Sequence, residues 1–138
     1  MTRTDKALLY TVIAAAAPVV VGMLLIVSPR SLARRNQTKI IKLLAQAHAV
    51  SPQASGEVTG PVALGDGTRL QPERSQIVAG YVLKLHLQST SFSIDARPVK
   101  AGVTGLLSYF RDATGVIRFD TSGKGANAES RPVAQPVP

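Results

Sequence analysis

The longest apolar run of the chain covers residues 7–27 and contains no charged side chain. A helix of this length, at about 1.5 Å per residue, spans roughly 30 Å, the thickness of the hydrocarbon core of a bilayer. We therefore expect a transmembrane helix here. A cleaved signal peptide and a buried core helix are the alternatives. The length of the run and Pro18, which follows the small residues 14–17 where cleavage would occur, argue against the signal peptide.

Helical spacing continues beyond the apolar run. Apolar residues recur at intervals of three and four, at Ile40, Ile41, Leu44 and Ala47. Pro52 and Gly56 then interrupt the pattern. The sequence predicts a basic amphipathic helix over residues 28–50 that continues from the membrane segment, with residues 1–6 as a short leader-like segment before it.

Residues 51–75 have no periodic apolar pattern and are rich in Gly, Pro, Ser and Thr. This composition is typical of a surface loop, with at most a short strand near residues 61–64.

Strict alternation of apolar and polar residues begins after residue 76. Tyr81, Leu83, Leu85 and Leu87 share one side of a strand, and the segment 91–98 repeats the pattern after a short turn. Two further strands, "GLLSYFRD" and "GVIRFD", are joined through a turn at residues 112–115, where Gly115 can adopt a positive φ. Consecutive strands with one apolar face each predict an antiparallel sheet over residues 76–120.

These elements predict an α+β fold. We expect a long N-terminal helix, membrane-spanning in its first half, packed on a C-terminal antiparallel sheet of about four strands, because the apolar face of the sheet needs a cover. Residues 121–138 contain few large apolar side chains and three prolines in their last seven positions, which predicts a flexible tail.

The net charge of +8 is concentrated in one segment. Residues 28–50 contain no acid and five basic residues, Arg30, Arg34, Arg35, Lys39 and Lys42. Because this segment directly follows the apolar run, we expect these side chains to contact the anionic headgroups of membrane lipid. Residues 51–138 carry a net charge of only +2 with few aromatic residues, which makes nucleic acid a poor candidate partner.

Candidate chemistry is sparse. The chain has no cysteine, and its two histidines, His48 and His86, fall on different predicted elements. Asp95 is explained by strand alternation and Asp112 by turn chemistry. The segments "GDGT" and "GKGA" lack the spacing of a phosphate-binding loop, and no serine lies in a nucleophile elbow. We therefore expect no catalytic residue, no metal, no cofactor, no small-molecule substrate and no enzyme activity.

Several short motifs in residues 76–131 occur in the order and spacing of a known family. The matching residues are Gly80, Tyr81, Ala96, Pro98, Gly102, Thr104, Gly105, Ser108–Phe110, Asp112, Thr114–Arg118 and Gly125–Ala128. This half of the chain resembles bacterial type IV pilin-like and pseudopilin-like proteins, and the N-terminal half resembles them in layout.

The resemblance implies a peptidase processing site before the apolar run. Aligning Pro29 with the proline of the family's helix places that site at Lys6 and Ala7, with Leu8 as the first mature residue. Val12 stands where the family has a glutamate, which in the family is thought to pair with the N-terminal amine of a neighbouring subunit. The resemblance thus implies a minor or accessory subunit of a pilus or secretion-type assembly, with other pilin-like subunits as partners of its N-terminal helix.

The resemblance also implies a single-pass protein of the bacterial inner membrane with its C-terminal domain in the periplasm or outside the cell. The basic residues after the apolar run favour the opposite orientation by the positive-inside rule. The alternative function is an unprocessed, membrane-anchored binding or regulatory module that does not polymerise. Cleavage of the first seven residues distinguishes the two.

Overall fold

The computed structural model of the protein describes residues 28–50 and 56–134. Helix α2 covers Pro29–Ala45. The Ser28 side chain caps its first turn by accepting a hydrogen bond from the Ser31 N–H, and Pro29 occupies a position in the first turn where no helical N–H bond is required. The helix ends at Gln46, and the chain turns directly into the first strand.

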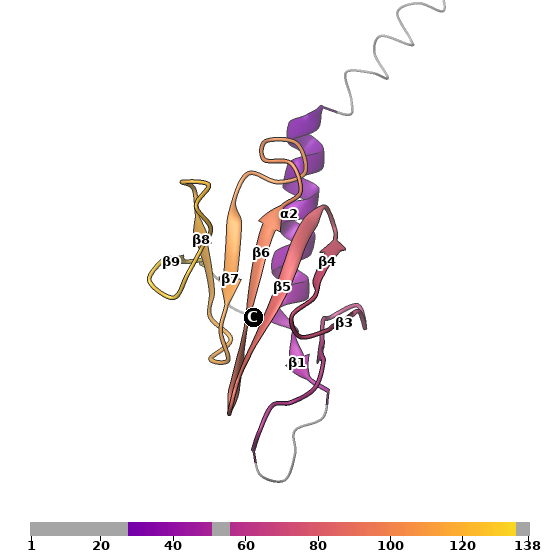
Figure 1. Cartoon of the computed structure of the whole chain (residues 1–138). Coiled ribbons are helices and arrows are strands. Elements are labelled where there is room, and N and C mark those ends of the chain that lie inside the picture. The colour runs from indigo at the N-terminus through magenta and orange to yellow at the C-terminus, as the bar shows by residue number, and fades with distance from the viewer. Residues whose placement is uncertain (1–27, 51–55, 135–138) are drawn as a thin grey trace, which may run out of the picture.

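The larger sheet has six antiparallel strands whose spatial order follows their order in the chain (Figure 1). The strands are β4 (Ser75–Val78), β5 (Tyr81–Gln88), β6 (Ser91–Pro98), β7 (Ser108–Arg111), β8 (Ile117–Asp120) and β9 (Arg131–Pro132). Alternation decides which side chains face inward. Along β5 the residues Tyr81, Leu83 and Leu85 are buried, and Leu85 lies opposite Ile94 of β6.

The smaller sheet has three antiparallel strands, β1 (His48–Ala49), β2 (Val62–Ala63) and β3 (Arg69–Leu70). It lies beyond the C-terminal end of α2 and beside β4 and β5 (Figure 1). Its buried side chains, Val62 and Leu70, extend the hydrophobic core below the helix.

One core joins these elements. Helix α2 runs along one face of the six-stranded sheet and buries Ile40, Leu43 and Leu44 against it (Figure 1). Tyr81, Leu83, Ile94 and Tyr109 form the facing layer, and each is at most 1% exposed. The opposite face of this sheet is open to solvent, which agrees with its alternation of apolar and polar residues.

The expected fold of a long N-terminal helix on a sheet of about four strands is wrong. The described residues contain a helix of 17 residues and two antiparallel sheets, of three and six strands, and are mostly β. The strands that were missed are short. Strands of two residues, such as β1 and β3, show no alternation, and Pro132 in β9 argues against a strand unless it lies at a sheet edge, where it is found.

None of the helices in residues 28–50 and 56–134 is long and apolar enough to cross a membrane. The predicted transmembrane segment 7–27 and the leader-like residues 1–6 lie outside the described residues.

Candidate functional site: a groove between α2 and β8

Four of the residues that carry the resemblance, Gly80, Tyr81, Thr104 and Gly105, lie close together near the middle of α2. Gly80 adopts a φ of +77°, and a Cβ atom there would lie 2.6 Å from Nδ2 of Asn36. That same Nδ2 donates a hydrogen bond of 2.9 Å to the Thr104 carbonyl oxygen. Gly105 lies on the ring of Tyr81 so closely that a Cβ atom would be 2.2 Å from the tyrosine oxygen. Close packing at Gly80 and Gly105, together with the hydrogen bond to Thr104, therefore holds the connection between β6 and β7 against α2 and β5.

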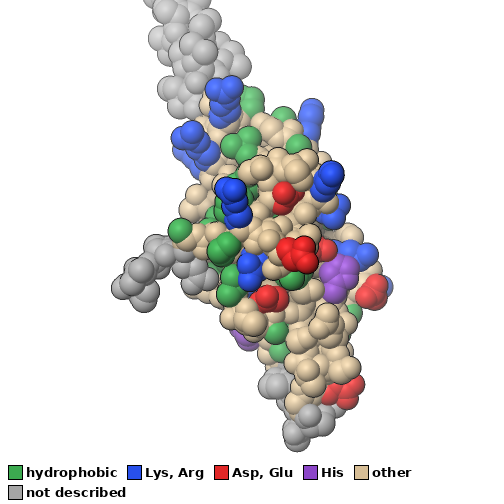
Figure 2. Space-filling model, turned by 90° about the vertical axis from the view of Figure 1, so that its left-hand side faces the viewer, with side chains coloured by type: hydrophobic (Ala, Val, Ile, Leu, Met, Phe, Trp, Pro, Cys, Tyr) green, Lys and Arg blue, Asp and Glu red, His purple; other side chains and the backbone are tan. Residues whose placement is uncertain are grey.

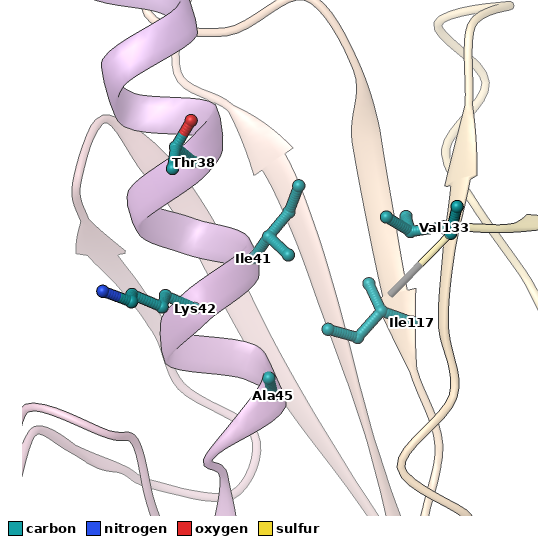
Figure 3. Close-up of a pocket in the computed structure, with 7 residues that line it drawn as sticks. Thr38, Ile41, Lys42, Ala45, Ile117 and Val133 are labelled. Atoms are coloured by element: carbon teal, nitrogen blue, oxygen red, sulfur yellow. The ribbon is translucent and has the colours of Figure 1, made fainter. Parts of the chain in front are cut away.

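A groove lies between α2 and the part of the six-stranded sheet formed by β8 and the segment after β9 (Figure 3). Its volume is about 420 Å³, within the range of roughly 300–1,000 Å³ that is common for ligand-binding sites. The lining residues are Thr38, Ile41, Lys42 and Ala45 from α2, Ile117 from β8, and Val133 and Ala134 from the segment after β9. The walls are thus mainly apolar.

The segment after β9 is held at the groove by the backbone. The N–H of Val133 donates a hydrogen bond of 2.8 Å to the carbonyl oxygen of Ile117. Figure 3 shows Val133 and Ile117 on one side of the groove and Ile41 opposite them on the helix. The groove therefore has a helical wall and a strand wall, each fixed by its own hydrogen bonds.

One residue of the helical wall, Lys42, is basic, and further basic residues lie next to it on α2. Arg34, Thr38 and Lys42 are spaced four residues apart and form one row on α2, and Thr38 and Lys42 line the groove. No acid occurs in α2, and the one ion pair among the described residues is His86 with Asp95, on other elements. On the side of the molecule that carries β8 and β9, hydrophobic side chains gather with several Lys and Arg side chains around them (Figure 2).

The five basic residues that we expected at lipid headgroups all lie on α2 with exposed side chains. They are Arg30, Arg34, Arg35, Lys39 and Lys42. Of these, Lys42 also lines the groove. The predicted processing residues Lys6, Ala7 and Leu8 lie outside the described residues.

A second, polar hollow lies on the solvent face of the sheet. His86 of β5 and Asp95 of β6 form a hydrogen bond of 3.0 Å between Nε2 and Oδ2. Lys84, Arg97 and Ser75 line the same hollow.

Asp112, which the sequence placed in a turn, accepts a hydrogen bond of 2.9 Å from the Thr114 N–H. Across the described residues, no group of three or more His, Cys, Asp or Glu side chains is arranged to hold a metal ion.

Family models, curated proteins and solved structures provide no match to this chain. The function is therefore argued from the sites themselves.

Two tyrosines fill the centre of the core beside α2. The rings of Tyr81 and Tyr109 are tilted by 46° with centroids 5.9 Å apart. Burial raises the pKa of Tyr81 to about 12. Burial, together with the neighbouring Tyr81, raises the pKa of Tyr109 still further. Burial thus favours the neutral form of both hydroxyl groups.

These raised pKa values predict a loss of stability at alkaline pH. The unfolded chain ionises its tyrosines near about pH 10, so the stabilisation is fully present below that pH and is lost as the pH rises toward about 12. A Tyr10→Phe variant of the full chain keeps only the two core tyrosines, Tyr81 and Tyr109. In this variant we expect no tyrosinate absorbance from the folded protein near pH 10 and a steep, cooperative rise when the core opens. The urea-unfolded chain serves as the control. Ionisation near pH 10 with an intact sheet would contradict the prediction.

The groove and one buried cation were not predicted from the sequence. Arg111 of β7 is 7% exposed, and its guanidinium carbon lies 5.3 Å from the centre of the Phe92 ring. Its Nε and Nη1 atoms have no hydrogen-bond partner among the described residues, and burial lowers its pKa, an effect that nearby Asp112 opposes. Alternation along β7 indicates that Arg111 faces inward, because it lies two residues after the buried Tyr109. The groove had no local signal, because its two walls come from distant parts of the chain.

Proposed function

We propose that this chain is a pilin-like or pseudopilin-like structural subunit, minor or accessory, of a pilus or secretion-type assembly. Residues 7–27 anchor it in the bacterial inner membrane in a single pass, and the described domain lies in the periplasm or outside the cell. Its partners are membrane lipid and other pilin-like subunits, which it contacts through the apolar segment.

The observation that carries the proposal is the cluster at the middle of α2. The motif residues come from two segments of the chain, 80–81 and 104–105, that pack together. Gly80 and Thr104 lie against Asn36, and Gly105 lies against the ring of Tyr81. Close packing explains why these residue types occur in the motifs, and this supports the resemblance more strongly than a match of scattered residues would.

The position of α2 gives further support. The helix begins at Pro29, directly after the apolar segment 7–27, and its exposed face is basic. A basic face at the start of a membrane-proximal domain is attracted to anionic headgroups, with each Lys or Arg near the surface contributing about 1 kcal/mol. The domain would therefore sit close to the membrane surface.

The test is the intact mass of the protein purified from its native membrane. We expect a mature chain that begins at Leu8, with a methylated amine. An Ala7→Gly variant, which restores the residue that the family has at this position, should be processed at least as completely. A chain that begins at Met1 or Thr2 in both proteins would overturn the proposal.

A second candidate is favoured by the groove between α2 and β8. An open apolar groove of about 420 Å³ suits a membrane-anchored binding or regulatory module that does not polymerise. This function predicts the full-length mass and recovery of the protein without other pilin-like subunits. A reporter fused after Pro138 gives its orientation, and cytoplasmic activity of that reporter would exclude the pilin-like function.

A further inference from the structure

The groove between α2 and β8 has features of a docking surface for a partner chain. Five of its seven lining residues are apolar, and its floor is the well-packed core side chain Ile117. The hydroxyl of Thr38 already donates a hydrogen bond to the Arg34 carbonyl oxygen. Lys42 is therefore the one charged residue that lines the groove. A small polar ligand would find few groups to orient it, whereas apolar side chains would fill the groove.

The charges around the groove indicate what chemistry a bound partner should have. The row Arg34, Thr38 and Lys42 places positive charge along the helical wall, and these basic residues have no ion-pair partner in the described part of the chain. On the β9 side of the groove the charge differs, because the positive charge of Arg131 lies in a neighbouring hollow with the negative charges of Asp120 and Glu129. The groove therefore attracts negative charge on its α2 side and is nearly balanced on its β9 side.

We propose that this groove docks an acidic amphipathic segment of a partner protein. The apolar face of the segment enters between Ile41 and Ile117, and its carboxylates lie along α2 within reach of Lys42 and Arg34. This mode of recognition, a helix with regularly spaced apolar anchors in a groove, is common among protein complexes. The proposal goes beyond the structural role proposed above and holds whether or not the chain is processed.

A membrane surface is the less favourable occupant. The groove begins at Thr38, about 14 Å along α2 from Pro29, and continues to Ala45 near the far end of the helix. In a chain anchored through residues 7–27, this half of α2 is separated from the anchor by the first turns of the helix. The basic residues of the first turns can therefore meet headgroups while Lys42 remains free for a protein partner.

The experiment uses the full chain in nonionic detergent micelles and a labelled synthetic peptide of about 18 residues, long enough to form a helix when bound. Leucines in the peptide recur at helical spacing, and glutamates flank them. A peptide of the same composition in scrambled order is the control. We expect saturable binding of the patterned peptide by fluorescence anisotropy, at least about tenfold tighter than that of the scrambled peptide.

Variants of the exposed residues on α2 locate the site. Ala45→Arg places a long side chain over the groove without burying a charge, and we expect it to abolish binding. Lys42→Glu should weaken binding about tenfold. Lys39→Glu makes the same change of charge on a residue that does not line the groove, and it should have an effect of less than about threefold. Circular dichroism verifies that each variant is folded.

Four results would overturn the proposal. Equal binding of the patterned and scrambled peptides would show non-specific attraction, as would equal effects of Lys42→Glu and Lys39→Glu. Displacement of the peptide by anionic phosphatidylglycerol vesicles, but not by neutral phosphatidylcholine vesicles, would assign the groove to lipid. Self-association of the chain that Ala45→Arg abolishes would assign it to a second copy. None of these results depends on where the mature chain begins.

Discussion

Replacing Tyr81 by alanine should lower the free energy of unfolding by about 4 kcal/mol. The residue is 0% exposed, and its ring packs against Tyr109 and Gly105. Alanine would remove the ring and leave a cavity that β5, fixed by its two neighbouring strands, cannot close. The free energy is measured by urea-induced unfolding of the full chain in detergent, followed by far-ultraviolet circular dichroism.

Tyr81→Phe is the matched control for this loss. The Tyr81 hydroxyl is buried and has no hydrogen-bond partner among the described residues. Removing the oxygen should therefore leave stability unchanged or raise it by about 1 kcal/mol, because an unpaired buried hydroxyl is costly. A loss as large as that of the alanine variant would show that the hydroxyl, rather than the ring, is the stabilising group, and would contradict the prediction.

Gly105→Ala should cost about 3 kcal/mol through a steric conflict. The added Cβ atom would lie 2.2 Å from the oxygen and 2.5 Å from the Cζ atom of Tyr81, closer than atoms can approach without movement. The tyrosine is packed on every side, so the β6–β7 connection must shift and strain the hydrogen bond from Asn36 to Thr104. Urea-induced unfolding gives the change.

A double-mutant cycle identifies the cause of this effect. In a Tyr81→Ala background the conflict is gone, so Gly105→Ala should cost less than about 1 kcal/mol, and the two substitutions should be strongly coupled. Gly60→Ala is a control, since a Cβ atom there has no neighbour within 4 Å. Additive effects of the two substitutions would mean that glycine is required at residue 105 for a reason other than the tyrosine ring.

The extent of successful prediction follows from the length of each element. Strands β5 and β6 each have eight residues, so alternation over that length reveals both the strand and its buried side. Strand β2 falls within residues 61–64, where the sequence allowed a short strand, but β1 and β3 were missed. They have two residues each, and Leu70 of β3 enters a core that other elements create. Local pattern cannot reveal a strand whose stability comes from such distant contacts.

The same distinction applies to the candidate sites. The basic face of α2 was visible because its charges are close in sequence. The groove was not, because Ile41 and Val133 are brought together by the whole path of the sheet between them. The tail composition around Pro132 and Val133 predicted flexibility, yet backbone hydrogen bonds to β8 hold residues 131–133 in place.

The sequence by itself determined the apolar segment 7–27, the basic face of the following helix, the β5–β6 hairpin and the inward face of its strands, because each is a repeating pattern within one short stretch. The tertiary structure alone decided the length of α2, the three-stranded sheet, the burial of Arg111 and the groove beside β8. These features arise where segments distant in the chain compete to cover one core, and the outcome depends on which surfaces fit together.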